Sequence, residues 1–133
     1  TRTRPPRTPT PKPPPYVYIT VVAGCWHSGG TFIEGRVTNA QGEESGVRVA
    51  GSTSPGTGNI YYVTTGTTPG KTPGYYVFPI NAHGPAPGTY YVWIADSSGK
   101  PLSDPYAGRV TTNALGPNDP GACWLAEVSF GRR

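Results

Sequence analysis

From residue 16 onward, Gly or Pro interrupts the chain nearly every ten residues, and no apolar stripe with the 3.6-residue period of a helix lies between them. The segments between these interruptions are short and rich in Val, Ile, Tyr and Thr, the residue types that favour β-strands. Many short strands at this spacing are typical of a β-sandwich or barrel, so the chain is predicted to be all-β. The eight expected strands are residues 16–23, 31–39, 46–53, 59–66, 74–81, 89–96, 106–112 and 122–130.

Alternation along a strand predicts which side chains face inward, because adjacent residues point to opposite faces of the sheet. In the last expected strand, Ala126, Val128 and Phe130 should therefore face the core. Glu127 and Ser129 should face the other way, which gives this strand one buried and one solvated face.

Three strands contain a pair of adjacent tyrosines, and alternation should place one ring of each pair in the core and one at the surface. In the strand at 89–96, Trp93 should share a face with Tyr91, and Tyr90 should share the opposite face with Val92 and Ile94. The three pairs are Tyr61-Tyr62, Tyr75-Tyr76 and Tyr90-Tyr91.

The first fifteen residues have a different composition, consisting of seven Pro, four Thr, three Arg and one Lys. They are predicted to form an extended arm or linker, named here the arm. Residues 16–133 are enough for one two-layer core, so they are expected to form a single domain.

The net charge of +4 belongs to the arm, where Arg2, Arg4, Arg7 and Lys12 carry four of the eleven positive charges. The other seven Lys and Arg residues balance the seven acidic residues. A nucleic-acid-binding module would concentrate Lys and Arg on a face of its fold, so nucleic acid is not an expected partner. No apolar run approaches the roughly 20 residues of a membrane span, and membrane insertion is not expected either.

The two cysteines, Cys25 and Cys123, are each followed by Trp, in a chain without Met and with few charged residues. These features predict a disulfide in an extracellular protein, with two buried free thiols as the alternative. A metal site would need more Cys or His at ligand spacing, and His27 and His83 are far apart in the sequence. Neither a metal nor another cofactor is expected.

Catalytic motifs are missing from the sequence. There is no Gly-x-Ser-x-Gly segment to present a hydrolase serine. Asp96, Asp104 and Asp119 lie in expected turns but match no calcium-loop spacing, so a role in the turns themselves is predicted. The chain is therefore not expected to be an enzyme.

Two stretches carry a resemblance. Residues 35–42 read Gly-Arg-Val-Thr-Asn-Ala-Gln-Gly and are followed by Gly-Val-Arg-Val at 46–49, while residues 87–92 and 96–103 form a later strand and turn. This pattern resembles carboxypeptidase-regulatory-like and related Ig-like domains of bacterial surface proteins, and the closing strand resembles a disulfide-tied variant that follows Thr/Pro tracts. The resemblance implies an Ig-like Greek-key β-sandwich of seven or eight strands, secreted or at the cell surface, without shared catalytic residues.

The arm has several readings. As a polyproline II rod it would span about 45 Å at about 3.1 Å per residue, and it could dock on its own domain or carry residues 16–22 into the sheet edge of a neighbour. Its threonines are candidate O-glycosylation sites, and the arm could also be a passive linker. The candidate glycosylation sites are Thr1, Thr3, Thr8 and Thr10.

Aromatic residues offer a second candidate surface. Trp26 and Trp124 adjoin the cysteines and either pack in the core near the disulfide or form a platform for sugar rings or a partner subunit. One ring from each tyrosine pair, at Tyr61, Tyr75 and Tyr90, would extend this surface.

These observations favour an extracellular structural protein, a subunit of a fibre or surface array in which the arm docks on a neighbouring copy. Such a head-to-tail contact need not close into a ring and can produce an open filament. The alternatives are a carbohydrate-binding or adhesive module tethered by the arm, and a spacer without self-contact. The expected assembly residues are Arg2, Arg4, Arg7, Pro9, Pro11, Lys12, Pro13, Pro14, Pro15, Tyr16 and Tyr18.

Overall fold

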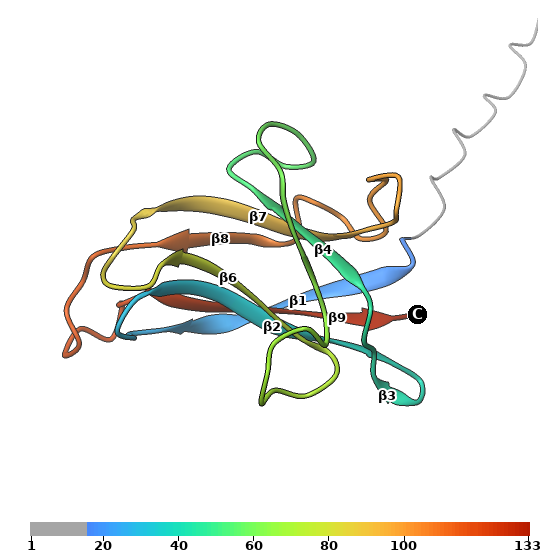
Figure 1. Ribbon diagram of the computed structural model, residues 1–133. Helices are drawn as coiled ribbons and strands as arrows, with labels where there is room; N and C mark the ends of the chain where they lie inside the picture. The colour runs from blue at the N-terminus through green and yellow to red at the C-terminus, as the bar shows by residue number, and fades with distance from the viewer. Residues whose placement is uncertain (1–15) are drawn as a thin grey trace, which may run out of the picture.

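The computed structural model describes residues 16–133, which form two packed β-sheets and, within that range, no helix (Figure 1). The predicted all-β sandwich is confirmed, and each of the eight predicted strands has a counterpart. The two-residue strand β3 was not predicted. The strands are β1 (Tyr18–Trp26), β2 (Thr31–Asn39), β3 (Gly42–Glu43), β4 (Arg48–Ser52), β5 (Tyr61–Thr64), β6 (Tyr75–Asn81), β7 (Gly88–Ala95), β8 (Arg109–Thr112) and β9 (Leu125–Arg132).

The first sheet has the order β1-β9-β2, and β6 and β3 both pair with the far edge of β2. Its pairs are antiparallel except β2 with β9, which run parallel. The second sheet has the order β5-β4-β7-β8 and is antiparallel throughout. The order of the first sheet places β1 and β6 at opposite edges. Across the sandwich, β5 contacts β6 and β8 contacts β9.

The core lies between the sheets and follows the predicted alternation. In β9, Ala126, Val128 and Phe130 are buried, whereas Glu127 and Ser129 are only partly exposed because β9 is an inner strand of its sheet. The inward orientation predicted for this strand is therefore confirmed, and its outer face is less solvated than expected.

A second, smaller apolar cluster covers the outer face of the second sheet. Trp93, Ala50 and Ala95 are buried there, and Ile60 and Tyr91 pack against them. The shared face predicted for Trp93 and Tyr91 is confirmed.

The tyrosine pairs do not divide between core and surface as predicted. Tyr75 and Tyr76 are both buried, although they point to opposite faces of β6. Tyr75 is buried because its hydroxyl donates to the carboxylate of Glu34 and the guanidinium of Arg36 lies 5.9 Å from its ring centroid. Polar neighbours on the outer face have therefore covered a ring that alternation alone would expose.

The exposure of the other two tyrosine pairs depends on where their strands lie in the second sheet. Tyr61 and Tyr62 are both exposed because β5 is a four-residue edge strand. Tyr90 and Tyr91 are both partly buried, the first against the main core and the second against the outer cluster. Tyr90 does pack with the cluster that contains Val92 and Ile94, as predicted.

Candidate functional site

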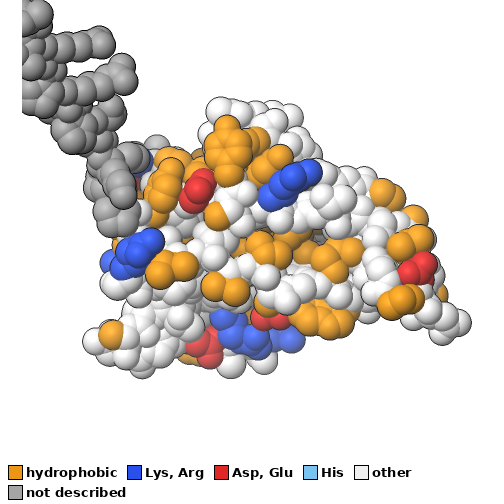
Figure 2. Space-filling view, turned by 180° about the vertical axis from the view of Figure 1, so that it is seen from behind, with side chains coloured by type: hydrophobic (Ala, Val, Ile, Leu, Met, Phe, Trp, Pro, Cys, Tyr) orange, Lys and Arg blue, Asp and Glu red, His pale blue; other side chains and the backbone are white. Residues whose placement is uncertain are grey.

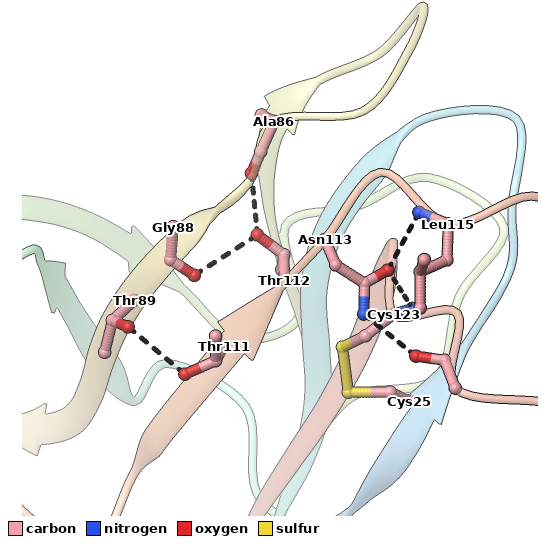
Figure 3. The surroundings of a disulfide bond; sticks show 10 residues. Cys25, Ala86, Gly88, Thr89, Thr111, Thr112, Asn113, Leu115 and Cys123 are labelled. Carbon is pink, nitrogen blue, oxygen red and sulfur yellow. Dashed lines mark hydrogen bonds between the residues drawn. A yellow bond between two sulfur atoms is a disulfide. The ribbon is translucent and has the colours of Figure 1, made fainter.

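The disulfide joins β1 to the segment just before β9 (Figure 3). Cys25 and Cys123 form the predicted bond. The side-chain carbonyl of Asn113 accepts from the backbone amides of Cys123 at 2.9 Å and Leu115 at 3.2 Å, while its amide donates to the Gly121 carbonyl at 2.8 Å. One asparagine and one disulfide therefore fix the loop at 113–123 to the first sheet.

The two tryptophans beside this disulfide are not core residues. Trp26 is exposed, and Trp124 is partly buried with its indole NH donating to the Leu115 carbonyl at 2.9 Å. The ring of His27 lies 4.3 Å from that of Trp124, tilted by 45°. Of the two readings for these tryptophans, core packing is therefore wrong.

A groove of about 650 Å³ opens between the sheets where β5 faces β6. Its lining is mostly apolar, and its innermost residues, Ile33, Phe78 and Val92, belong to the buried core. Gly51 also contributes to the lining. A Cβ atom at Gly51 would lie 3.2 Å from the ring of Phe78, so the glycine leaves room for the aromatic floor. The lining includes Ile33, Gly51, Tyr61, Val63, Phe78 and Ile80, with Tyr90 and Val92 behind them.

Polar groups occur at the mouth of this groove. Thr53 and Asn59, both exposed, contribute to the lining beside Tyr61, which is 69% exposed. The volume falls within the range of about 300 to 1,000 Å³ that is usual for ligand pockets, and a mostly apolar wall with a few polar groups is the usual lining.

Tyr62 belongs to the same rim but is held on the outer face of its sheet. The guanidinium of Arg48 lies 3.8 Å from its ring centroid and donates to the Ser97 carbonyl at 3.1 Å. This stacking fixes Tyr62, which leaves Tyr61 as the exposed ring able to meet a ligand at the mouth.

The predicted aromatic surface is therefore not one patch. Trp26 and Trp124 lie by the disulfide, and Tyr61 and Tyr90 line the groove. The expectation of an exposed ring at Tyr75 is wrong, because that side chain is only 6% exposed.

The other exposed apolar feature is a row of side chains along β1. Ile19 and Val21 of this strand, with Val17 just before it, alternate with inward-facing residues and are each more than one-third exposed. Figure 2 shows hydrophobic side chains reaching the surface among Lys and Arg on the face turned away from Figure 1. The row formed by these three residues, with the free side of β1, is named here the β1 edge.

Within residues 16–133, no strand pairs with β1 on the side away from β9. The Val17 carbonyl accepts from the amide of Arg133 at 2.9 Å, so the odd-numbered residues bond to β9 and the even-numbered ones face outward. The Leu102 carbonyl accepts from the outward amide of Tyr18 at 3.0 Å, but Thr20 and Val22 lie beyond this contact. Unpaired strand edges of this kind can bind another chain.

Tyr18 is a core residue of β1 and not a free part of the arm. It is 2% exposed, and its hydroxyl donates to the carboxylate of Glu44 at 2.8 Å and accepts from Arg132 at 2.9 Å. Burial and the neighbouring Glu44 raise the pKa of this phenol. Tyr18 is also one of the predicted assembly residues, and within this chain residues 18–22 pair with β9 of their own domain.

The rest of the predicted arm adjoins this strand. Tyr16 is exposed and its carbonyl accepts from the Arg133 side chain at 2.8 Å, so the first described residue lies beside the C-terminus. The remaining candidate residues lie outside the described part of the chain. They are Arg2, Arg4, Arg7, Pro9, Pro11, Lys12, Pro13, Pro14 and Pro15, with the candidate glycosylation sites Thr1, Thr3, Thr8 and Thr10.

The three turn aspartates act within their own turns, as predicted. Asp96 accepts from the hydroxyl of Ser98 at 2.7 Å and from the amides of Lys100 and Ser98, each at 2.9 Å, and these bonds lower the pKa of its carboxyl. Asp104 accepts from the amide of Tyr106 at 2.9 Å and Asp119 from that of Gly121 at 2.8 Å. Within residues 16–133, no three His, Cys, Asp or Glu side chains gather where they could hold a metal, and no helix could cross a membrane.

The chain matches no protein-family model, no curated protein and no solved structure. The groove and the β1 edge are therefore the features from which its function is inferred.

Proposed function

We propose that the chain is a non-catalytic extracellular structural domain, a subunit of a bacterial fibre or surface array in which the arm of one copy docks on the next. The observation that supports this best is the β1 edge. The cationic, Pro-rich arm is followed by Val17 and by β1, which lies at the edge of its sheet within residues 16–133 and exposes Ile19 and Val21. A row of apolar side chains along an open strand edge is a surface suited to a protein partner.

The extracellular assignment is supported by the disulfide, which persists in oxidising compartments. The carboxypeptidase-regulatory-like assignment is supported by the positions of the resembling motifs. Residues 35–42 span the end of β2 and its turn into β3, and residues 46–49 lead into β4. Both of these stretches lie on strands and turns of the sandwich, which supports the assignment.

A head-to-tail contact fits the position of the arm. The arm begins on the β1 side, and the opposite side of the sandwich carries β5 and β6, so the two sides differ in surface. Contacts between two different surfaces can repeat without closing, which gives an open filament.

The test compares the full chain with residues 16–133, which retain all nine strands and the disulfide. Sedimentation velocity and negative-stain electron microscopy of the full chain should show concentration-dependent oligomers, and the shorter chain should be monomeric. Equal assembly by both chains would overturn the role of the arm. A full chain that stays monomeric would favour the spacer reading.

A carbohydrate-binding or adhesive module remains the second candidate, supported by the exposed ring of Tyr61 beside the polar side chains of Thr53 and Asn59. Aromatic faces with nearby hydrogen-bonding groups suit sugar rings. Retention of the full chain on insoluble polysaccharides, lost in Y61A, would support this reading. Absence of retention on a panel of cell-wall and plant polysaccharides would count against it.

A further inference from the structure

We propose that the groove beside Tyr61 is a polyproline-binding site whose occupant is the arm of a second copy of this chain. The inference rests on the proposed function and names the surface that receives the arm. It starts from two facts about the described domain. The groove has aromatic walls, and it opens on the side of the sandwich opposite to the strand from which the arm departs.

The chemistry of the groove suits a proline-rich ligand. Proline-rich segments dock in grooves lined by aromatic side chains, because their polyproline II conformation is already formed and little ordering entropy is lost. Here the exposed ring of Tyr61 and the partly buried ring of Tyr90 line the groove, with Phe78 only 6% exposed in its floor, and Ile80 completes an apolar wall. Polyproline II chains have no internal hydrogen bonds, so their carbonyls can accept from a phenol hydroxyl at the rim such as that of Tyr61.

The arm contains the matching pattern. Polyproline II repeats every three residues, and two Pro-x-x-Pro units occur, at 6–9 and 11–14. In this conformation Pro6 and Pro9 share one face, while Arg4 and Arg7 share another. A bound arm can therefore bury prolines in an uncharged groove and keep both guanidinium groups in water.

Geometry favours a neighbouring copy over the arm's own domain. Fifteen residues at about 3.1 Å each give a rod of about 45 Å, long enough to reach another domain. Its own groove lies across the width of the first sheet, from β1 past β9 and β2 to β6. An arm that turned back over this distance would lose the extended conformation that the groove recognises, so the acceptor is the next copy.

The first experiment compares full-length variants at two exposed tyrosines. Tyr61 is 69% exposed and lines the groove, whereas Tyr106 is 70% exposed and lies elsewhere, so Y61A and Y106A remove equally exposed rings. In sedimentation velocity, Y61A should require at least tenfold more protein to assemble, Y61F should be intermediate, and Y106A should match the parent. Equal assembly by Y61A and Y106A would overturn the proposal, provided that circular dichroism shows both folded.

The second experiment separates the groove from the proposed function. A synthetic peptide of residues 1–15 is titrated into the full-length double variant P6A/P9A, labelled with ¹⁵N. Shifts at Tyr61, Phe78, Ile80 and Tyr90 support the groove, whereas shifts along β1 or none overturn it. If P6A/P9A prevents assembly and Y61A does not, arm-driven assembly stands and the groove is wrong.

If the parent chain itself does not assemble, the proposed function fails, and the same titration still decides whether the groove binds polyproline. A second titration with soluble polysaccharide shows whether the groove prefers glycans. Shifts at Tyr61 and Tyr90 with polysaccharide alone would overturn the polyproline assignment.

Discussion

The hydroxyl of Tyr76 in β6 donates a hydrogen bond to the backbone carbonyl of Val128 in β9, although β2 lies between these two strands. The contact is possible because β2 has Gly35 at the crossing point. A Cβ atom on Gly35 would lie 1.7 Å from the Val128 oxygen and 3.1 Å from the Tyr76 ring. Because Gly35 has no side chain, the side chain of Tyr76 can cross β2 and reach the Val128 carbonyl on β9.

Gly35→Ala should be one of the most destabilising small substitutions in the domain. The added methyl must displace the backbone of β9, which has no flexible side chain to absorb the change. We expect a loss of about 3 kcal/mol or more in the free energy of unfolding, at the upper end of overpacking effects. Urea unfolding followed by Trp fluorescence measures it. Gly29→Ala is the matched control because its Cβ would meet nothing within 4 Å, and equal losses would contradict the account.

Tyr76→Phe tests the hydrogen bond without changing the packing. Tyr76 is fully buried, and removing its hydroxyl leaves the Val128 carbonyl without this donor in the core. The expected loss is about 1 to 2 kcal/mol, measured in the same unfolding experiment. A Phe variant as stable as the parent would show that this contact contributes nothing net.

Reduction of the disulfide should destabilise the domain, because the unfolded chain gains conformational entropy when the cross-link is lost. Cys25 and Cys123 are separated by 98 positions, and a loop of about 100 residues corresponds to about 4.7 kcal/mol in the chain-entropy model. We expect C25S/C123S to lower the urea midpoint by the corresponding amount. The parent should match the variant in reducing buffer, and a variant as stable as the oxidised parent would refute the effect.

The domain should lose stability at alkaline pH. Burial is the main cause that raises the pKa of Tyr18, Tyr75 and Tyr76, and neighbouring carboxylates raise each further. A raised pKa means that the unfolded state loses its phenol protons first. The stability from these groups is therefore complete below about pH 10, the ordinary tyrosine pKa, and is lost as pH rises through the folded values.

Urea unfolding from pH 8 upward measures this dependence, and Y75F should flatten the alkaline slope because it removes one of the three phenols. Titration of the tyrosine phenols by ultraviolet absorbance, in folded and in urea-unfolded protein, measures their pKa values independently. Identical phenol titration in both states would contradict the prediction.

Local signals were sufficient to predict the strands. Turn-forming Gly and Pro residues and the alternation of apolar residues are properties of short segments, so they identify β2 and β6 almost to the residue. The disulfide could be predicted because two cysteines allow one intramolecular pairing. The two-residue β3 could not, since it is defined only by its pairing with Thr38 and Asn39.

The candidate sites depended on contacts that sequence patterns do not contain. Alternation places Tyr75 on an outer face but cannot show that Glu34 and Arg36 cover it. The groove lies where Gly51 on β4 approaches Phe78 on β6 and where the pairing of β5 with β4 begins only at Tyr61. Only the three-dimensional arrangement brings these strands together, although a glycine within a predicted strand was a usable sign of close approach.

Thr20 and Thr31 form a natural pair for testing how much buried hydroxyls contribute. The Thr31 hydroxyl donates to the Gly84 carbonyl at 3.0 Å and accepts from the Ala86 amide at 2.9 Å, whereas the buried Thr20 hydroxyl has no partner within residues 16–133. Val has nearly the same shape as Thr. Thr20→Val should therefore stabilise the domain by up to about 1 kcal/mol because it removes a desolvated polar group.

Thr31→Val should instead cost about 1 to 3 kcal/mol, because the backbone groups of Gly84 and Ala86, both partly buried, lose their partner. Urea unfolding of both variants at neutral pH gives the comparison. Equal destabilisation by the two substitutions would mean that Thr20 makes a hydrogen bond beyond these contacts. The arm adjoins β1 in the sequence, so the full chain and residues 16–133 should be compared to find out whether the arm supplies that bond.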